Sequence, residues 1–202
     1  MIAYVNGRFV DDREASVSVF DRGFLYGDSV FETLRVSNGR PFRWPLHVER
    51  LRKGAAFLGI SVPTPPKELR SIMASLTDRN QLAEGLLRIT LSRGPGARGY
   101  SPREAGPPTL VVTAHELPPA SGDWRLRTAS LKVAVGDKLG GHKVGSRLLN
   151  VLARAEAESA GADEALILNT SGEVLEAASG NVFGCNATWC SPRPRPLVRC
   201  RA

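Results

Sequence analysis

The first 184 residues of this 202-residue chain contain no cysteine, and the three cysteines present, Cys185, Cys190 and Cys200, all lie near its end. A disulfide framework that would hold the body of the protein together is therefore excluded. A structural zinc site needs about four ligands at defined spacing, and the end of the chain offers three thiols and no histidine. We expect a fold without disulfides and without a bound metal.

Long apolar runs are also missing. No segment approaches the roughly 20 apolar residues that cross a membrane as a helix. The N-terminal residues MIAYVNGRFVDD become polar too early for the apolar region of a signal peptide. The sequence thus predicts a cytoplasmic protein that does not associate with membranes.

The positive charge of the chain is concentrated at its end. Of the net charge of +7, four arginines belong to residues 184–202, which contain no acidic residue. The rest of the chain has 23 basic and 20 acidic residues, and it contains no basic stripe with interleaved aromatic residues. We therefore expect no nucleic-acid partner, although a binding module built on the Arg/Pro-rich end stays an alternative.

Periodicity and turn residues predict mixed helices and strands. Asn6-Gly7 supplies the turn of a hairpin, Thr64 is a suitable N-cap ahead of two prolines, and Gly161 is a suitable helix end. The expected elements are a hairpin over 2–10, helices over 46–58, 65–79 and 147–160, and strands over 86–92, 109–114, 124–128, 131–135, 165–168 and 173–177.

Two unequal blocks separated by a Pro-rich stretch indicate an α+β protein of two domains. We assign residues 1–114 to the first domain, 115–123 to a linker, 124–183 to a partial second domain and 184–202 to an aberrant Arg/Pro/Cys tail. Composition and periodicity do not name a reaction.

Two residues stand out as candidates for chemistry. Lys143 is one of only five lysines and follows a glycine pair ahead of a predicted helix. An amine near the positive end of a helix can act as a nucleophile. Alternatively, Lys143 is an ordinary solvated lysine in a loop. Glu176 follows a turn on a predicted strand that places it on one face with Val174. It could keep a heterocyclic nitrogen protonated, or it could be an ordinary strand-edge glutamate.

Two arginines could recognise anions. Arg50, in the segment LHVERLRKG, could grip a phosphate in a two-pronged contact. Its alternative is a surface arginine paired with a neighbour such as Glu49. Arg98 lies in a Gly/Pro/Arg-rich loop, where Gly96 and Gly99 allow close backbone approach and Arg98 could meet a carboxylate. Its alternative is a solvent-exposed loop residue.

Five motifs occur in order along the chain and together resemble the class IV aminotransferases. They are FDRGFLYGDSVFETLRV, HVERL, SRGPGARGYSP, HKVGSRLLNVLARAEAESAGADEALILN and GEVLEAASGNVF. The resemblance covers residues 1 to about 183. It implies a fold type IV enzyme of two domains that uses pyridoxal 5′-phosphate (PLP) and forms a homodimer.

The resemblance also implies roles for individual residues. Lys143 would hold PLP covalently and move protons, Glu176 would pair with the ring nitrogen and Arg50 would bind the phosphate. Thr33 would lie near the reacting carbon and Asn181 near the cofactor. On the substrate side, the carboxylate would be received by Arg98 and Tyr100.

Within this family the RGY element and Arg147 resemble the lyases. Phe31 and Tyr100 depart from the D-amino-acid aminotransferases, and Gly145-Ser146 departs from the usual Leu-Asn. We expect a lyase that converts 4-amino-4-deoxychorismate to 4-aminobenzoate and pyruvate, as in folate biosynthesis. The alternative is an aminotransferase of branched-chain or D-amino acids.

The residues after Phe183 do not match the family, in which a phosphate-binding loop follows. Alternating Pro and Arg should not continue a strand ladder. We hypothesise a frameshift that replaced the family's C-terminus, which would leave an incomplete second domain with exposed apolar faces and an inactive member of the family. A natural lineage-specific tail is the alternative.

Overall fold

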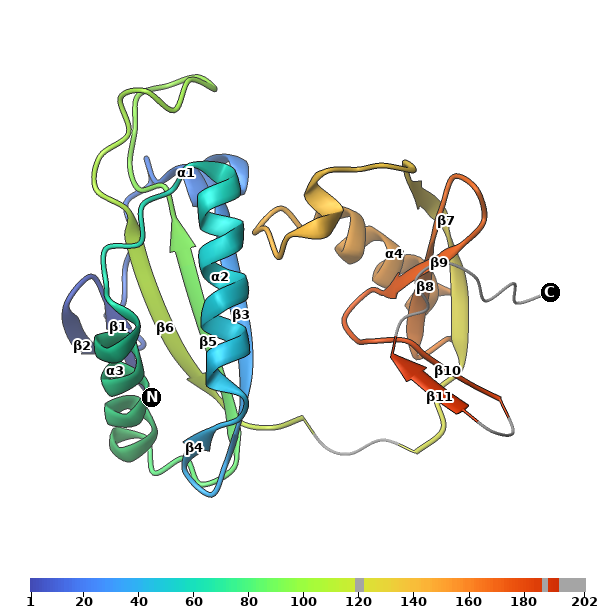
Figure 1. Cartoon of the computed structure of the whole chain (residues 1–202), viewed down its shortest axis with the longest axis horizontal. Coiled ribbons are helices and arrows are strands. Elements are labelled where there is room, and N and C mark those ends of the chain that lie inside the picture. The colour runs from blue at the N-terminus through green and yellow to red at the C-terminus, as the bar shows by residue number, and fades with distance from the viewer. Residues whose placement is uncertain (119–121, 187–188, 193–202) are drawn as a thin grey trace. The chain divides into compact units, whose positions relative to one another are not determined.

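The computed structural model describes residues 1–118, 122–186 and 189–192. The chain divides into two compact units, which we treat separately (Figure 1). The first unit comprises Met1–Pro119 and Leu139–Ser146, and the second comprises Ala120–Lys138 and Arg147–Ala202. Helices and strands are mixed in both units, as the sequence predicted.

The first unit is built on an antiparallel sheet of six strands in the order β2-β1-β6-β5-β3-β4. The strands are β1 (Ile2–Val5), β2 (Arg8–Asp11), β3 (Ser29–Ser37), β4 (Arg40–Pro41), β5 (Gly85–Ser92) and β6 (Thr109–His115). The predicted β1–β2 hairpin is confirmed, with Asn6 and Gly7 at φ of 45° and 94°. Such positive angles are the ones a tight hairpin turn requires.

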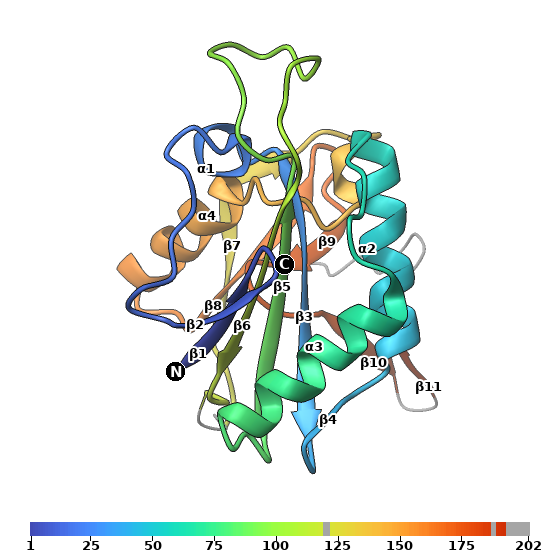
Figure 2. The same ribbon diagram turned by 90° about the vertical axis from the view of Figure 1, so that its left-hand side faces the viewer.

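One face of this sheet is covered by two helices. They are α2 (Trp44–Leu58), which packs on β3, and α3 (Pro66–Arg79), which packs on β1 and β6 (Figure 2). The apolar positions of β3, Val30, Leu34 and Val36, join Leu51 and Ala55 of α2 in one core. Alternation along β3 leaves every second side chain on the opposite face of the sheet.

Two helix starts differ from the prediction. Helix α3 is preceded by Pro65 as its N-cap, with ψ of 149° and no side-chain cap, so Thr64 does not cap it. Pro65 takes this place because its fixed φ of −59° leads directly into the helix. Helix α2 begins at Trp44, two residues before the predicted start.

A short helix, α1 (Arg22–Tyr26), precedes β3 and ends at Gly27, which has φ of 68°. The loop between β5 and β6 projects beyond the end of the sheet at which α1 lies (Figures 1 and 2). This loop contains the RGY element.

Segment Leu139–Ser146 belongs to the first unit, although the sequence assigned it to the second domain. Val144 forms an antiparallel bridge with Val30 of β3. Gly145 donates its N–H to the carbonyl of Ser29, and a Cβ at this glycine would clash with the Ser29 hydroxyl. The segment thus extends the sheet by pairing with the free edge at the start of β3.

The second unit contains a sheet of three strands in the order β7-β8-β9 and one helix. The elements are β7 (Leu126–Val133), α4 (Leu148–Ser159), β8 (Glu164–Asn169) and β9 (Val174–Ala177). The two strands predicted over 124–128 and 131–135 are one strand, β7. It pairs in parallel with β8 on both sides of a register shift between Thr128 and Lys132. The residues between those two positions thus form an irregularity within β7 rather than a turn.

The core of the second unit is small. Among the described residues, its cluster of packed buried hydrophobic residues consists of Ala129, Ala153, Ala157, Ala165 and Ile167. Helix α4 meanwhile exposes 67% of Leu148 and 59% of Val151. This helix therefore carries an exposed apolar face.

The first part of the expected aberrant tail forms a hairpin. Strands β10 (Phe183–Asn186) and β11 (Trp189–Pro192) pair in a two-stranded sheet of their own, with Cys185 opposite Cys190. A strand ladder thus reaches as far as Pro192, further than the sequence predicted. The rest of the tail lies outside the described residues. In the part of the chain that the structure describes, no helix is long and apolar enough to cross a membrane.

Candidate active site

The position of Lys143 is set by its backbone. Its carbonyl accepts a hydrogen bond from the N–H of Phe31 at 2.9 Å, next to the bridge between Val30 and Val144. The side chain is half-buried, and its Nζ lies 4.5 Å from the centre of the Phe31 ring. The neighbouring His142 stacks on Phe57 of α2, with ring centres 4.0 Å apart. The backbone of Lys143 is thus held against β3, and its neighbour His142 contacts α2.

The strands that carry Phe31 and its neighbours also carry Arg88 and Thr33. The Arg88 guanidinium lies 3.9 Å from the centre of the same Phe31 ring. Thr33 pairs with Arg88 in the β3–β5 register and is half-buried. Phe31 and Thr33 alternate with the apolar core positions of β3, so they share the face opposite α2.

On the α2 side, Arg50 is bound to a buried carboxylate. Glu32 of β3 is 0% exposed, and it accepts hydrogen bonds from Arg50 Nε at 2.5 Å and Arg50 Nη2 at 2.7 Å. His47 Nδ1 lies 2.7 Å from the same carboxylate. A buried charge of this kind is stable only when it is paired and hydrogen-bonded.

These contacts shift two pKa values. Burial raises the pKa of Glu32, but hydrogen bonds and charges from Arg50 and His47 outweigh it and leave the pKa below its ordinary value. The hydrogen bond to Glu32 raises the pKa of Arg50. Both groups are therefore charged at neutral pH.

This geometry changes the expectation for Arg50. The two-pronged contact predicted for a phosphate is made with Glu32 instead, because the Nε and Nη2 edge faces the buried carboxylate. The side chain is still 53% exposed, and within the described residues Nη1 has no hydrogen-bond partner. An anion could therefore be bound only through the outer N–H groups.

Glu32 and His47 were not predicted from the sequence. The available signal was a glutamate at a position of β3 that alternates with the core residues Val30 and Leu34, facing a histidine and an arginine three residues apart on α2.

Arg98 and Tyr100 lie on the projecting β5–β6 loop. Arg98 is exposed, and Tyr100 is 85% exposed with its ring 5.4 Å from that of Tyr26 in α1. The loop backbone is fixed at this point, since Tyr26 Oη accepts a hydrogen bond from the N–H of Gly99. Side chains of this pair are thus presented to solvent from an anchored backbone.

Glu176 lies in the second unit on β9. Its carboxylate accepts a hydrogen bond from Asn150 Nδ2 at 3.2 Å and lies 3.6 Å from Arg147 Nη1. A register shift between the pairs of Glu176 and Val174 with β8 interrupts the alternation that was predicted to place both on one face. Asn181, the other cofactor candidate of this unit, is exposed between β9 and β10.

The predicted site residues therefore fall into two groups. Thr33, Arg50, Arg98, Tyr100 and Lys143 belong to the first unit, and Glu176 and Asn181 to the second. The functional groups are an amine, a guanidinium with outward N–H groups and a half-buried carboxylate. Each of these groups matches in kind one functional group of PLP, namely its carbonyl carbon, its phosphate or its basic ring nitrogen.

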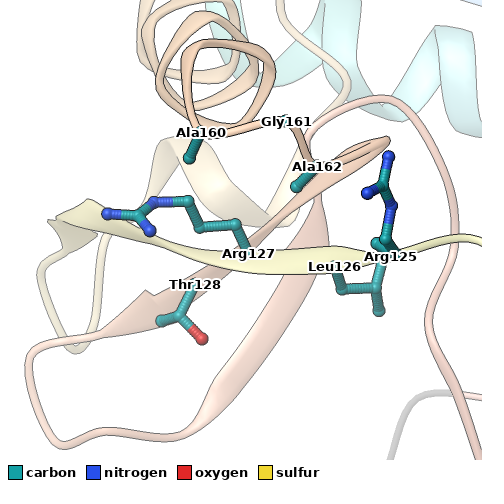
Figure 3. A pocket seen from close by; sticks show the side chains of 7 residues that line it. All are labelled: Arg125, Leu126, Arg127, Thr128, Ala160, Gly161 and Ala162. Atoms are coloured by element: carbon teal, nitrogen blue, oxygen red, sulfur yellow. The ribbon is translucent and has the colours of Figure 1, made fainter.

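A surface pocket elsewhere in the second unit does not include these residues. It lies between the start of β7 and the end of α4 (Figure 3) and is lined by Arg125, Leu126, Arg127, Thr128, Ala160, Gly161 and Ala162. Its arginines are already paired, Arg125 with Asp163 at 3.4 Å and Arg127 with Glu156 at 3.7 Å. Among the described residues, no cluster of His, Cys, Asp and Glu could hold a metal ion.

Comparison with known proteins identifies similar chains. The sequence profile of the family described as amino-transferase class IV matches residues 29–198. A protein of Methanocaldococcus jannaschii named as a branched-chain-amino-acid aminotransferase is 38% identical over 186 residues, which are 91% of this chain and 65% of that one. The aminodeoxychorismate lyase of Bacillus subtilis is 30% identical over 184 residues, which are 89% of this chain and 63% of the lyase.

A solved structure with the same fold is the branched-chain amino acid aminotransferase of T.th. with pyridoxamine 5′-phosphate. It superposes with a TM-score of 0.85 at 32% identity, over 94% of this chain and 66% of that one. The chain thus spans about two thirds of the length of the proteins it resembles.

Proposed function

Because this chain belongs to the class IV aminotransferase family, we propose that it acts as a PLP-dependent enzyme with Lys143 as the residue that binds the cofactor covalently. The observation that carries the proposal is the half-buried amine of Lys143, which extends over Phe31 from a backbone pinned to β3. Enzymes of this family use PLP. Lys143 lies in the segment HKVGSRLLNVLA, which directly follows the glycine pair Gly140-Gly141.

Three side chains would hold the cofactor. Lys143 would bind its carbonyl carbon, the outer N–H groups of Arg50 would bind its phosphate, and Glu176 would pair with its ring nitrogen. Asn150 and Arg147 already orient the Glu176 carboxylate through a hydrogen bond and an ion pair. Asn181 is a further candidate near the ring.

When bound, PLP supplies an electron sink next to the amine-bearing carbon of the substrate. The chain's own residues do the rest. The amine of Lys143 removes and returns protons at that carbon, and the hydroxyl of Thr33 lies on the same face of the sheet as Phe31. Arg98 and Tyr100 would receive the substrate carboxylate.

For the reaction we propose the lyase that converts 4-amino-4-deoxychorismate to 4-aminobenzoate and pyruvate. The RGY element on an anchored loop and Arg147 beside Glu176 support this choice. The B. subtilis relative, named aminodeoxychorismate lyase, is consistent with it. A homodimer in the cytoplasm is the expected form of the enzyme.

A branched-chain aminotransferase is the second candidate. The M. jannaschii relative and the T.th. structure both carry that name. The two activities share the residues that bind the cofactor, so only the products separate them.

The first test is the visible absorption spectrum of the 202-residue protein with added PLP, before and after borohydride. We expect an absorption band that borohydride removes. After reduction, the cofactor should be covalently attached to Lys143. The band should be absent in Lys143→Ala and present in the matched control Lys138→Ala. Labelling that survives in Lys143→Ala would contradict the assignment.

The second test gives the same protein two substrates in separate assays. Release of 4-aminobenzoate and pyruvate from 4-amino-4-deoxychorismate supports the lyase. Transfer of the amino group of leucine to 2-oxoglutarate without release of 4-aminobenzoate supports the aminotransferase instead.

A further inference from the structure

The motif FDRGFLYGD contains a buried arginine that contacts the loop between β5 and β6. Arg22 is 4% exposed, and its Nε donates to Asp28 Oδ2 at 2.9 Å. Its Nη1 and Nη2 donate to the carbonyls of Gly99 and Tyr100 at 2.9 and 3.0 Å. Two successive carbonyls directly after Arg98 are thus bound by one planar guanidinium, which restricts both peptide planes.

A second arginine fixes the base of the same loop. Arg93 donates to both oxygens of Asp28, at 2.7 and 3.1 Å, and to the carbonyls of Leu58 and Gly59 at the end of α2. Asp28 is therefore shared by Arg22 and Arg93. Burial raises the pKa of Asp28, but hydrogen bonds and charges from these two arginines leave it below its ordinary value.

The aromatic residues of α1 and the loop complete the contact. Tyr26 Oη accepts from the N–H of Gly99, the ring of Tyr26 meets that of Tyr100, and the Arg22 guanidinium lies 5.0 Å from the Tyr26 ring centre. Gly99 has φ of 112°, a conformation that side chains disfavour. A Cβ on Gly96 would lie 3.2 Å from Arg22 Cδ. The loop backbone therefore lies directly on α1.

We propose that Arg22 is a positioning residue for substrate recognition, which holds Arg98 and Tyr100 in the orientation that receives the carboxylate of an amino substrate. Asp28, with Tyr26, keeps the Arg22 guanidinium in place. This inference rests on the proposed function, because it assigns the carboxylate to Arg98 and Tyr100. It gives a role to the motif around α1, which the chemistry of Lys143 does not use.

Limited digestion with trypsin tests the contact without any cofactor or activity. Arg98 and Arg103 are exposed in the loop and followed by residues that permit cleavage. In Arg22→Lys, which keeps the charge but loses the planar fork, we expect cleavage after these residues to be about tenfold faster, as the loop opens more often. Tyr26→Phe should give a smaller increase. Arg35→Lys is the matched control, since Arg35 is exposed and pairs with Glu84.

The substrate role is tested by kinetics on the same variants. We expect the KM for the amino substrate to rise about tenfold in Arg22→Lys with kcat much less affected, and borohydride trapping of PLP to stay at the wild-type level. Circular dichroism confirms that each variant is folded. If Arg22→Lys does not fold, Tyr26→Phe carries the test.

Two results would overturn the inference: wild-type cleavage rates in folded Arg22→Lys and Tyr26→Phe, or a loosened loop with an unchanged KM. Failure of the proposed function has a different signature, namely a wild-type protein that does not trap PLP. The digestion experiment tests the contact between Arg22 and the loop whether or not the protein traps PLP.

Discussion

The Nζ of Lys143 lies over the ring of Phe31, 4.5 Å from its centre, and the Arg88 guanidinium lies 3.9 Å from the same centre. The face of an aromatic ring attracts cations. Phe31 and Thr33 are two residues apart on β3 and therefore lie on the same face of the sheet. The Lys143 amine contacts this face through the Phe31 ring. Phe31 therefore positions the amine as well as filling space.

Replacing Phe31 tests this role. Phe31→Leu removes the ring but keeps much of its apolar volume, and we expect the rate of PLP trapping by borohydride to fall about two- to fivefold, since such contacts contribute about 0.5–1 kcal/mol. Phe31→Tyr, which keeps the ring, should trap PLP at nearly the wild-type rate. Equal rates in the two variants would contradict the role of the ring.

The buried carboxylate of Glu32 should be important for stability. Glu32→Gln leaves Arg50 and His47 without their anionic partner, and removal of one member of a buried ion pair costs about 3–5 kcal/mol. We expect urea denaturation to show a loss of this order in the free energy of unfolding. Glu49→Gln is the control, because Glu49 pairs with Lys53 on the exposed side of α2. Its effect should stay within about 0.5 kcal/mol. Equal effects of the two substitutions would show that Glu32 is not a buried partner in solution.

Acid should destabilise the first unit through Glu32 and Asp28. Their pKa values lie below the ordinary values of 4.5 and 3.8, so below these pH values the unfolded chain binds protons that the folded chain does not. The free energy of unfolding therefore falls as pH drops from about 4.5. We expect urea midpoints to be steady between pH 7 and 5 and to decline below. The decline should be shallower in Glu32→Gln, and a parallel decline in both proteins would rule out Glu32 as its source.

The exposed apolar residues of α4 should be replaceable. Leu148→Lys and Val151→Lys remove apolar side chains from a surface in contact with water, so the free energy of unfolding should change by less than about 0.5 kcal/mol. Binding of a hydrophobic dye should decrease. Ala153→Lys on the same helix is the matched control, because Ala153 is fully buried and a charge there should unfold the second unit. A large loss in the first two variants would mean that something covers this face in solution.

Elements with strong local signals could be predicted from the sequence. The hairpin turn at Asn6-Gly7 and the apolar periodicity of α2 and α4 depend on neighbouring residues, so their presence was recognisable. The single strand β7 was divided in two, because its continuity depends on pairing with β8, which comes later in the chain.

The charged residues of the site were harder to place. Neither Arg22 nor Glu32 was singled out from the sequence, since a charged residue gives no local sign that it is buried. Their partners, Gly99 and Tyr100 for Arg22 and Arg50 for Glu32, come from other parts of the chain. The contact of Val144 with Val30 was hidden for the same reason, so Lys143 was assigned to the domain of its neighbour α4.

The bridge between Val30 and Val144 also bears on the order of folding. The two residues lie far apart in the chain, and closing so long a loop costs conformational entropy before the contact can form. Most of the first unit lies within Met1–Pro119 and needs no such closure. During refolding we therefore expect the sheet to form first and the lysine to reach β3 later. The capacity to trap PLP should then return more slowly than the circular dichroism signal.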